Sequence, residues 1–350
     1  MTFNVTPMFP GDLYDSTDRM AAAGAAQWSQ ILELGWQGVL VSEDHGGVGA
    51  TLAEFSAIAE AAGRHALALP LIARCVIAPM LLAAASANAT ARALLEQLST
   101  GEASICPVLG SAVQATPDGA GRVRLQGQLK GADLSADASH LLFNTASAQL
   151  VLLDAKALPE ARYFTGLDGR RSADIALDGV SVDASQVLLQ GDAVKAAVKA
   201  ATDTGAVMTS VQTVGALGAM VEQTIEYLTT RSQFGVQLST FQALRHRLVE
   251  MYVAYESARG LVKDVTEALS ANPAANPRDA ALAKLYLASV GRTVAESAIQ
   301  LHGGMGMTVE MPAARLAMHV LMCNLQYGDR FHYLDTLSAQ MANDVAALAA

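Results

Sequence analysis

The chain has 350 residues, of which 52% are hydrophobic and 16% are charged, and its formal net charge is -10. That length is enough for two or three domains with sizeable cores. The acidic balance argues against nucleic-acid binding, because phosphate recognition requires a basic surface. The low charged fraction leads us to expect extensive burial, part of it between subunits.

The three cysteines, Cys75, Cys106 and Cys323, are far apart and have no CxxC spacing. We expect buried thiols in a reducing compartment, rather than a disulfide framework or a zinc site. No cluster of His, Cys and Asp has metal-site spacing, so no bound metal is predicted. No apolar segment led by Lys or Arg opens the chain, so the sequence predicts no signal peptide and a cytoplasmic location.

Residues 1–103 have a mostly helical pattern and are predicted to form an N-terminal helical domain. Helices are expected at 21–34, 52–63, in an Ala/Leu-rich run ending near 87, and at 91–98. Pro70, Arg74 and Pro79 interrupt that run, which favours buried helices over a membrane span. The Gly-rich segment 43–49 lacks the Walker lysine and the GxGxxG spacing, so we interpret it as a tight turn.

Residues 104–191 change to short alternating or β-branched runs, separated by Gly, Asp and Ser. The runs expected to be strands are 123–129, 140–144, 149–153, 174–177 and 180–182. We therefore predict a small antiparallel β domain in this part of the chain.

Residues 192–350 return to a helical period and are predicted to form a C-terminal four-helix bundle. One helix carries an apolar stripe with spacings of three and four, made of Phe241, Leu244, Leu248, Met251, Tyr255, Ala258 and Val262. The helix before it carries a similar stripe, made of Val211, Val214, Gly218, Val221, Ile225 and Leu228. The next helix starts with Asn276 as N-cap and Pro277, and its expected apolar positions are Ala281, Leu285, Val290 and Ile299. It stops at Gly303-Gly304, and a last helical region follows Pro312.

Two motifs lie at the junctions between these helices. The first is Arg231-Ser-Gln-Phe-Gly, followed by Phe241-Gln242, and the second is Gln300-Leu-His-Gly-Gly-Met-Gly306, followed by Glu310 and Pro312. Both resemble the flavin-contacting signatures of the acyl-CoA dehydrogenase family, and segment 35–49 resembles that family's N-terminal motif. Together the resemblance covers nearly the whole chain.

The resemblance implies an α+β subunit of the acyl-CoA dehydrogenase type, with an N-terminal helical domain, a middle antiparallel β domain and a C-terminal four-helix bundle. It also implies an FAD-dependent oxidoreductase that desaturates an acyl-CoA between its α and β carbons, as in the beta-oxidation of lipids or steroids. Members assemble as tetramers of such subunits and bind FAD at subunit contacts.

By this resemblance, the cofactor-binding residues are Arg231, Gln233, Phe234, Gln242, Gln300, Leu301, Gly303 and Gly304. Their chemistry suits the role, because arginine and glutamine offer donors to a pyrophosphate, phenylalanine packs on a ring, and glycine lets backbone amides approach. The alternative to flavin binding is that Gly303-Gly304 only ends a helix and that Phe234 is only a core residue. Taken together, the two motifs and their spacing favour a flavin-binding role.

The base that removes the α-proton in the family is a glutamate at one of two positions. Counting along the motifs places one position at Tyr327, before Gly328, and the other at about Gly205. Neither residue is a carboxylate, and tyrosine, with an ordinary pKa of about 10, is a poor base at neutral pH. The arginine that follows the second position in many members is replaced by Ala206.

Two nearby carboxylates, Asp203 and Asp329, are possible substitutes for the base. We interpret Asp203 as an ordinary polar residue in the first turns of a helix. Asp329 is the stronger candidate for the base, because its loop is where substrate and flavin meet in the family. His302 is expected to be structural or to bond near the cofactor, and His332 to lie at a surface or an interface.

These departures resemble the smaller, divergent subunits of heteromeric acyl-CoA dehydrogenases that act on steroid side chains or on pimeloyl-CoA. The first hypothesis is therefore a subunit that contributes flavin contacts and assembly, beside a larger catalytic subunit in an α2β2 heterotetramer, with electron-transfer flavoprotein or another acceptor taking the electrons. A second is a complete homo-oligomeric enzyme with Asp329 as base. A third is a non-catalytic structural or flavin-binding member.

Overall fold

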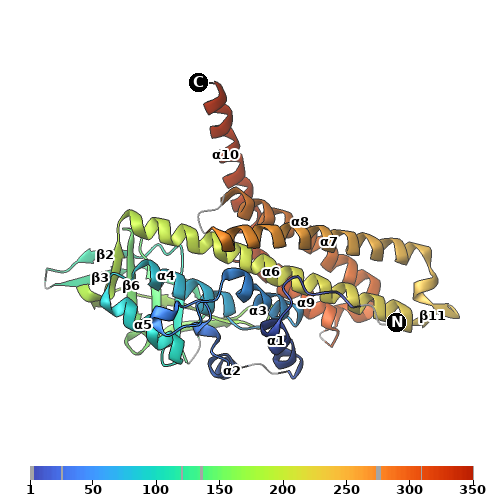
Figure 1. Cartoon of the computed structure of the whole chain (residues 1–350), viewed down its shortest axis with the longest axis horizontal. Coiled ribbons are helices and arrows are strands. Elements are labelled where there is room, and N and C mark those ends of the chain that lie inside the picture. The colour runs from blue at the N-terminus through green and yellow to red at the C-terminus, as the bar shows by residue number, and fades with distance from the viewer. Residues whose placement is uncertain are drawn as a thin grey trace. The chain divides into compact units, whose positions relative to one another are not determined.

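Figure 1 shows a computed structural model of the chain, which describes residues 4–24, 27–119, 121–134, 137–272, 277–308 and 310–349. The chain forms two compact units. The first comprises residues 1–26, 52–68 and 206–350, and the second comprises residues 27–51 and 69–205. The domain boundaries expected at 103/104 and 191/192 stay predictions.

The first hundred residues are helical, as predicted. The elements are α1 (Asp12–Ala22), α2 (Trp28–Glu33), α3 (Leu52–Arg64), a π-helix η3 (Ile72–Ile77), α4 (Ala78–Ala84) and α5 (Ala89–Thr100), with short 3₁₀ turns η1 (Trp36–Gly38) and η2 (Glu43–His45). The single helix predicted over 21–34 is wrong, because α1 ends at Ala22 and α2 begins only at Trp28, with Gly24 in the left-handed region between them. The Gly-rich segment is a tight turn, in which the amides of Gly47 and Gly49 bond the carbonyls of Ser42 and Val41.

In the described part of the region that follows, ten strands form three small sheets. They are β1 (Ile105–Val108), β2 (Gln114–Pro117), β3 (Arg122–Gln126), β4 (Gln128–Ala132), β5 (His140–Asn144), β6 (Gln149–Asp154), β7 (Ala161–Thr165), β8 (Arg171–Ala176), β9 (Ser181–Asp183) and β10 (Val187–Gln190). The sheet orders are β1-β5-β6-β10, β2-β3-β9 and β4-β8-β7. Alternating buried residues such as Val123, Leu125 and Leu129 form their common core.

Two details of the β region differ from the prediction. The pairing is not wholly antiparallel, because β1 runs parallel to β5. A parallel pair needs a long crossover, and here β2, β3 and β4 lie between the two strands in the chain. The run 123–129 is two strands, β3 and β4, which part at Gly127.

The rest of the chain is mainly helical, with α6 (Asp192–Thr230), α7 (Gln242–Ala271), α8 (Pro277–His302), α9 (Pro312–Leu325) and α10 (Arg330–Ala349). The overall class is therefore the predicted one, with helices, then β sheets, then helices. The region after Pro312, expected as one helical region, is two helices, because Tyr327 and Gly328 adopt left-handed conformations between them. Asn276, the expected N-cap, lies outside the described residues, but α8 does begin at Pro277.

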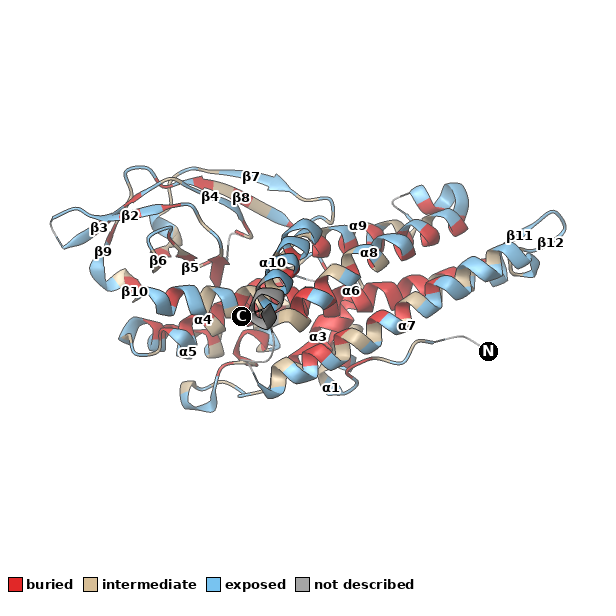
Figure 2. Ribbon diagram, turned by 90° about the horizontal axis from the view of Figure 1, so that it is seen from above, coloured by how far each residue is buried: buried red, intermediate tan, exposed pale blue. Residues whose placement is uncertain are grey.

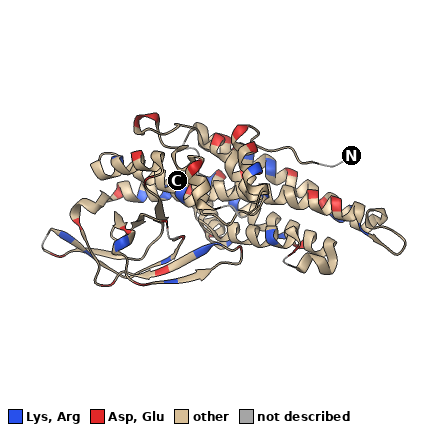
Figure 3. Ribbon diagram, turned by 90° about the horizontal axis from the view of Figure 1, so that it is seen from below, with Lys and Arg blue, Asp and Glu red and all other residues tan. Residues whose placement is uncertain are grey.

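Of the helices in the described residues, α6 alone is long and apolar enough to cross a membrane, and its apolar window is wholly buried inside the protein. Figure 2 shows α6 and α3 as largely buried ribbons. The two helices cross at Gly63 and Gly215, where an added Cβ would lie 2.0 Å from the Gln212 carbonyl oxygen or 2.1 Å from that of Glu60. Figure 3 shows acidic and basic residues interspersed along the ribbon.

The apolar stripes are confirmed only in part. On α7, Met251, Tyr255, Ala258 and Val262 are buried, but Phe241 is exposed and Leu244 and Leu248 are half-buried. On α8, the predicted positions Leu285, Val290 and Ile299 are only half-buried, and the buried face runs instead through Lys284, Leu287, Gly291, Val294 and Ala298. Ala281 is buried as predicted, and the other three predicted positions each lie next to a buried residue, because Ala-rich sequence gives little contrast between faces.

Candidate functional site

The first motif forms a two-stranded hairpin between α6 and α7. Its strands, β11 (Ser232–Gln233) and β12 (Val236–Gln237), are joined by Phe234 and Gly235, at φ of +56° and +80°. Two left-handed residues in succession make the tight turn that best matches the twist of a two-residue hairpin. The turn presents Phe234, which is 89% exposed, edge-to-face with Phe241 at 6.2 Å between ring centroids.

The polar side chains of this motif are all exposed. Arg231 directly follows α6, Gln242 begins α7, and Gln233 donates from Nε2 to the Ser232 carbonyl oxygen at 2.9 Å. A guanidinium group, two amide side chains and an exposed aromatic pair are therefore present in one short segment. This set can bind a phosphate and a planar ring.

The second motif ends α8. Gln300 is exposed, Leu301 is buried in the core, and Gly303, at φ +62°, leads into a 3₁₀ turn, η7 (Gly303–Met307). An added Cβ at Gly303 or Gly304 would meet nothing within 4 Å. The backbone of both glycines is therefore open to a ligand, whereas Leu301 is buried.

His302 brings the two motifs to the same end of the helical domain. Its ring lies 4.5 Å from that of Tyr227, on the last turn of α6, and its Nδ1 bonds the Ala298 carbonyl oxygen at 2.8 Å. Burial lowers the pKa of His302, which keeps the imidazole neutral. We call the end formed by residues 231–242 and 300–307 the flavin-motif end.

The flavin-motif end fits FAD in chemistry. An exposed guanidinium is available to the pyrophosphate, exposed aromatic rings to a ring face, and the open backbone at Gly303 and Gly304 to a close approach. The Nε2 atom of His302 is buried with no hydrogen-bond partner among the described residues, so it is a polar atom left to pair with a bound group.

Tyr327, predicted as one position of the family's base, and Ala206, next to the other predicted position, lie in one cluster of the first unit. The buried residues Ala206 on α6, Ala281 on α8, and Tyr333 and Leu337 on α10 form one apolar cluster. Leu285 and Tyr327 pack against it. We call this set the base-position cluster, because Tyr327 is the loop position and Ala206 directly follows the helix position, Gly205.

The two candidate substitute carboxylates have structural roles. Asp203 accepts from the Lys199 ammonium at 2.6 Å, one turn earlier on α6. Asp329 caps α10, since its Oδ1 accepts from the His332 amide at 2.9 Å and its carbonyl accepts from the Tyr333 amide at 3.2 Å. His332 is exposed and lies edge-on to the Tyr333 ring.

A polar residue that the sequence reasoning missed is Lys284. It is buried on α8, one position before Leu285, and its ammonium bonds Thr209 on α6 and the Cys323 carbonyl on α9. Its signal in the sequence is a lysine in register with Leu287 and Gly291 on the buried face.

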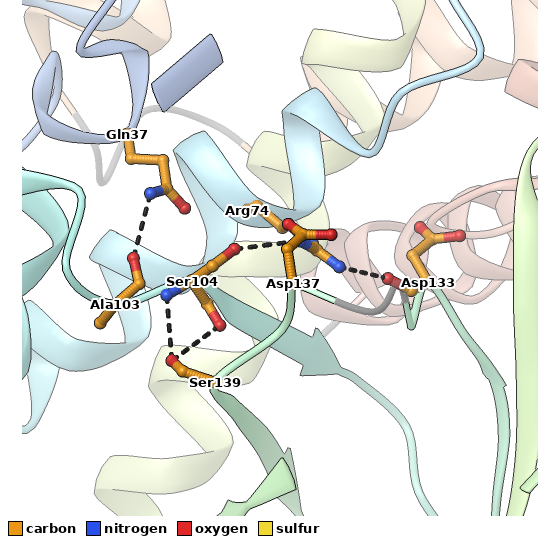
Figure 4. A network of polar contacts seen from close by, with 7 residues as sticks. All are labelled: Gln37, Arg74, Ala103, Ser104, Asp133, Asp137 and Ser139. Atoms are coloured by element: carbon orange, nitrogen blue, oxygen red, sulfur yellow. Dashed lines mark hydrogen bonds and ion pairs between the residues drawn. The ribbon is translucent and has the colours of Figure 1, made fainter. Parts of the chain in front are cut away.

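Arg74 was predicted only as an interruption of an apolar run, yet it organises a buried network in the second unit (Figure 4). Its guanidinium is fully buried and donates to Ser104 Oγ at 3.0 Å, Asp137 Oδ2 at 2.9 Å and the Asp133 carbonyl at 3.0 Å. It also lies 4.8 Å from the Trp28 ring centroid. The network ties the π-helix to the start of β1, and burial raises the pKa of the Asp133 carboxyl.

The three cysteines are free thiols and are buried, as predicted. Burial raises the pKa of Cys106 to about 12 and that of Cys75 further. Both thiols are therefore protonated and unreactive at neutral pH. The described residues contain no group of three His, Cys, Asp or Glu side chains arranged to hold a metal ion.

Comparisons with known proteins agree with the resemblance. Residues 12–102 match the acyl-CoA dehydrogenase N-terminal domain and residues 195–330 match the acyl-CoA dehydrogenase C-terminal domain. The chain is 28% identical over 286 residues to the acyl-CoA dehydrogenase IpdE2 of Mycobacterium tuberculosis, covering 81% of this chain and 76% of that protein.

Solved structures share the fold. The ChsE4–ChsE5 complex of Mycobacterium tuberculosis superposes with a TM-score of 0.81 at 22% identity, over 98% of this chain and 99% of that one. Butyryl-CoA dehydrogenase of Megasphaera elsdenii superposes with a TM-score of 0.81 at 20% identity, over 98% and 100%. With both terminal domains matched and the fold shared over its length, this chain belongs to the acyl-CoA dehydrogenase family of FAD-dependent oxidoreductases.

Proposed function

We propose that this chain is the smaller, divergent subunit of a heteromeric acyl-CoA dehydrogenase. It contributes flavin contacts and assembly, while a larger partner subunit supplies the catalytic glutamate. The α,β-desaturation of an acyl-CoA thioester is the reaction of the whole assembly.

The observation that carries the proposal is the base-position cluster. Ala206 and Tyr327 share one apolar cluster. Neither Tyr327 nor Gly205, the two positions that we take as those of the family's base, carries a carboxylate. Removal of a weakly acidic α-proton needs a base within hydrogen-bond reach in a dry pocket. A base from another subunit meets that need.

In the assembly, this chain's flavin-motif end binds FAD, with Arg231 and Gln233 toward the pyrophosphate and Phe234 against a ring. Gln242, Gln300 and the backbone from Leu301 to Gly304 complete the contacts. The bound flavin supplies the acceptor for a hydride from the acyl β-carbon. The residues of this chain bind and orient the cofactor and exclude water around it.

Exposed apolar side chains at the flavin-motif end support a subunit interface there. Besides Phe234, the side chains of Phe241, Val236, Met305 and Met307 are exposed, and Met307 reaches 78%. Isolated exposed apolar residues are ordinary, but a group of them around a cofactor motif marks a surface that another protein covers.

The names of similar proteins guide the choice of substrate and partner. One similar structure is the ChsE4–ChsE5 complex, and another is a variant of the Tcur3481–Tcur3483 steroid acyl-CoA dehydrogenase, at a TM-score of 0.79. We propose a steroid-derived or other lipid acyl-CoA as substrate, an α2β2 heterotetramer in the cytoplasm, and electron-transfer flavoprotein or a similar acceptor.

The alternative of a homo-oligomeric enzyme with Asp329 as base is less well supported, because that carboxylate caps α10. The alternative of a non-catalytic structural member predicts no turnover with any partner. Both are outcomes of one experiment.

The test is acyl-CoA-dependent dye reduction by the pure chain and by the chain co-expressed with a catalytic partner captured from its native host. General-base catalysis contributes about 10²–10⁴-fold, so the chain alone should be slower than the complex by about that factor. Robust turnover by the pure chain that disappears in Asp329→Asn would establish the homomeric enzyme instead. Failure of every co-purified complex to turn over would favour the structural role.

A further inference from the structure

Lys284 connects three helices through one buried ammonium group. Its Nζ donates to Thr209 Oγ1 on α6 at 2.7 Å and to the Cys323 carbonyl oxygen on α9 at 2.5 Å, and the side chain is 2% exposed. An ammonium group is buried only where its donors are satisfied, because its lost hydration is otherwise not replaced. These bonds therefore hold α6, α8 and α9 at one point.

The Cys323 carbonyl belongs to the last turn of α9, which ends at Leu325. The last four carbonyls of a helix lack partners within the helix, and a cation near them is also favoured by the helix dipole. Lys284 thus fixes the direction in which the chain leaves α9. The segment that follows, residues 326–329, is here called the 326–329 loop.

The far end of the 326–329 loop is held from α10. The Tyr333 hydroxyl donates to the Tyr327 carbonyl oxygen, and the Tyr333 ring is so close to Gly328 that an added Cβ there would lie 2.8 Å from it. Tyr327 itself has φ of +53°. A non-glycine residue in the left-handed region persists only where its surroundings determine the conformation.

We infer that Lys284 and Tyr333 are positioning residues that hold the 326–329 loop in one conformation, with the Tyr327 side chain packed into the base-position cluster. Lys284 acts at the start of the loop, through the Cys323 carbonyl, and Tyr333 acts within it, through the Tyr327 carbonyl. The loop is then a fixed wall of this subunit rather than a mobile lid. The inference rests on contacts within this chain and stands whether or not the proposed function is correct.

The test is amide hydrogen exchange on the full-length chain, read by mass spectrometry on peptides that span residues 326–333. Lys284→Met keeps the length of the side chain and removes the charge, and Tyr333→Phe removes only the hydroxyl donor. Lys284→Met should speed exchange in these peptides by roughly 10- to 100-fold, the range expected for loss of a charged hydrogen bond worth about 1.5–3 kcal/mol. Tyr333→Phe should speed it by roughly 3- to 10-fold, the range expected for a neutral hydrogen bond worth about 0.5–1.5 kcal/mol. Lys195→Met, at an exposed lysine paired with Asp192, is the matched control and should change nothing there.

Rescue separates positioning from general loss of packing. In Lys284→Ala, added propylammonium should restore slow exchange in residues 326–333, and propanol, of similar shape but neutral, should not. Local slowing by the cation alone supports the inference.

The inference is overturned if folded Lys284→Met and Tyr333→Phe both exchange in residues 326–333 at the wild-type rate. It is also overturned if exchange rises equally throughout α6, α8 and α9, since that would show general destabilisation. Should Lys284→Met fail to fold, Tyr333→Phe and Thr209→Val, which removes one acceptor and leaves the lysine, decide the question by the same peptides.

Discussion

At the residue scale, His302 shows how one side chain connects a motif to the fold. It lies in the second flavin motif, its ring contacts Tyr227 at the end of α6, and its Nδ1 is bonded to Ala298. Burial disfavours the charged imidazolium and so lowers the pKa of His302 below its ordinary value. The neutral imidazole is therefore part of the folded state.

This predicts an acid-sensitive contribution to stability. Because the pKa is lower in the folded than in the unfolded chain, the unfolded chain binds more protons as the pH falls below about 6.5, and stability falls with it. The contribution is present above that pH and is lost through the lowered folded-state pKa. In His302→Gln, the fall in urea midpoint on acidification should be shallower than in the wild type.

His332→Gln, at an exposed histidine, is the control for this experiment and should leave the acid slope as it is. An unchanged slope in His302→Gln would mean that His302 is not the group responsible.

Asp329 gives a second prediction at this scale. As the N-cap of α10, its replacement by alanine should lower the free energy of unfolding by about 1 kcal/mol, measured by urea titration. Asp335→Ala, an exposed acid inside α10, should change it much less. If Asp329→Ala leaves stability intact but abolishes turnover of the purified enzyme, then Asp329 is catalytic and its capping role is incidental.

At the element scale, the crossing of α3 and α6 depends on glycine. Gly63 and Gly215 bring the two backbones together, so that an added Cβ at either would overlap a carbonyl oxygen of the other helix. The same contact places Glu60, whose carboxylate accepts from the amides of Met8 and Phe9. Burial raises the pKa of the Glu60 carboxyl.

The glycines of these helices predict opposite effects of one substitution. Gly215→Ala should destabilise by at least about 1–3 kcal/mol, because the close crossing must open to admit a methyl group. Gly260→Ala on α7, where an added Cβ meets nothing within 4 Å, should stabilise by up to about 1 kcal/mol through helix propensity. Thermal or urea unfolding measures both, and equal effects of the two substitutions would contradict the close crossing.

At the scale of the whole molecule, the flavin-motif end remains uncovered in a single chain. The predicted stripe of α7 is buried from Met251 onward and exposed or half-buried at Phe241, Leu244 and Leu248. An apolar stripe that continues beyond the core of its own subunit indicates a surface for another one.

Arg231→Ala tests this end in the assembled enzyme. Loss of a charge-assisted contact to the pyrophosphate, worth about 1.5–3 kcal/mol, should weaken FAD binding by roughly 10- to 100-fold. Flavin content from the visible spectrum, and FAD affinity by titration of the apo-assembly, are the measurements. Arg292→Ala, at an exposed arginine paired with Glu296, is the control. If the two variants bind FAD with equal affinity, Arg231 is not part of the FAD site.

The sequence by itself determined the fold class, the family and the place of the two flavin motifs. These follow from local signals: the helical period of 192–350, the short alternating runs of 104–191, and motif residues adjacent in the chain. It also predicts, through the family resemblance, that Tyr327 stands where a glutamate would act. The direction of β1 relative to β5 could not be predicted from the sequence. Their parallel pairing joins segments far apart in the chain and leaves no local pattern.

Only the tertiary structure decided what surrounds the positions predicted for the base. Ala206 and Tyr327 share one cluster, and Lys284 is buried on α8, through contacts between segments that are distant in the chain. The structure also shows that Asp329 caps a helix. In the sequence, a lysine among alanines has the same pattern on either face of a helix. Its burial depends on which face meets α6 and α9, and that is set by the packing of whole helices rather than by any local preference.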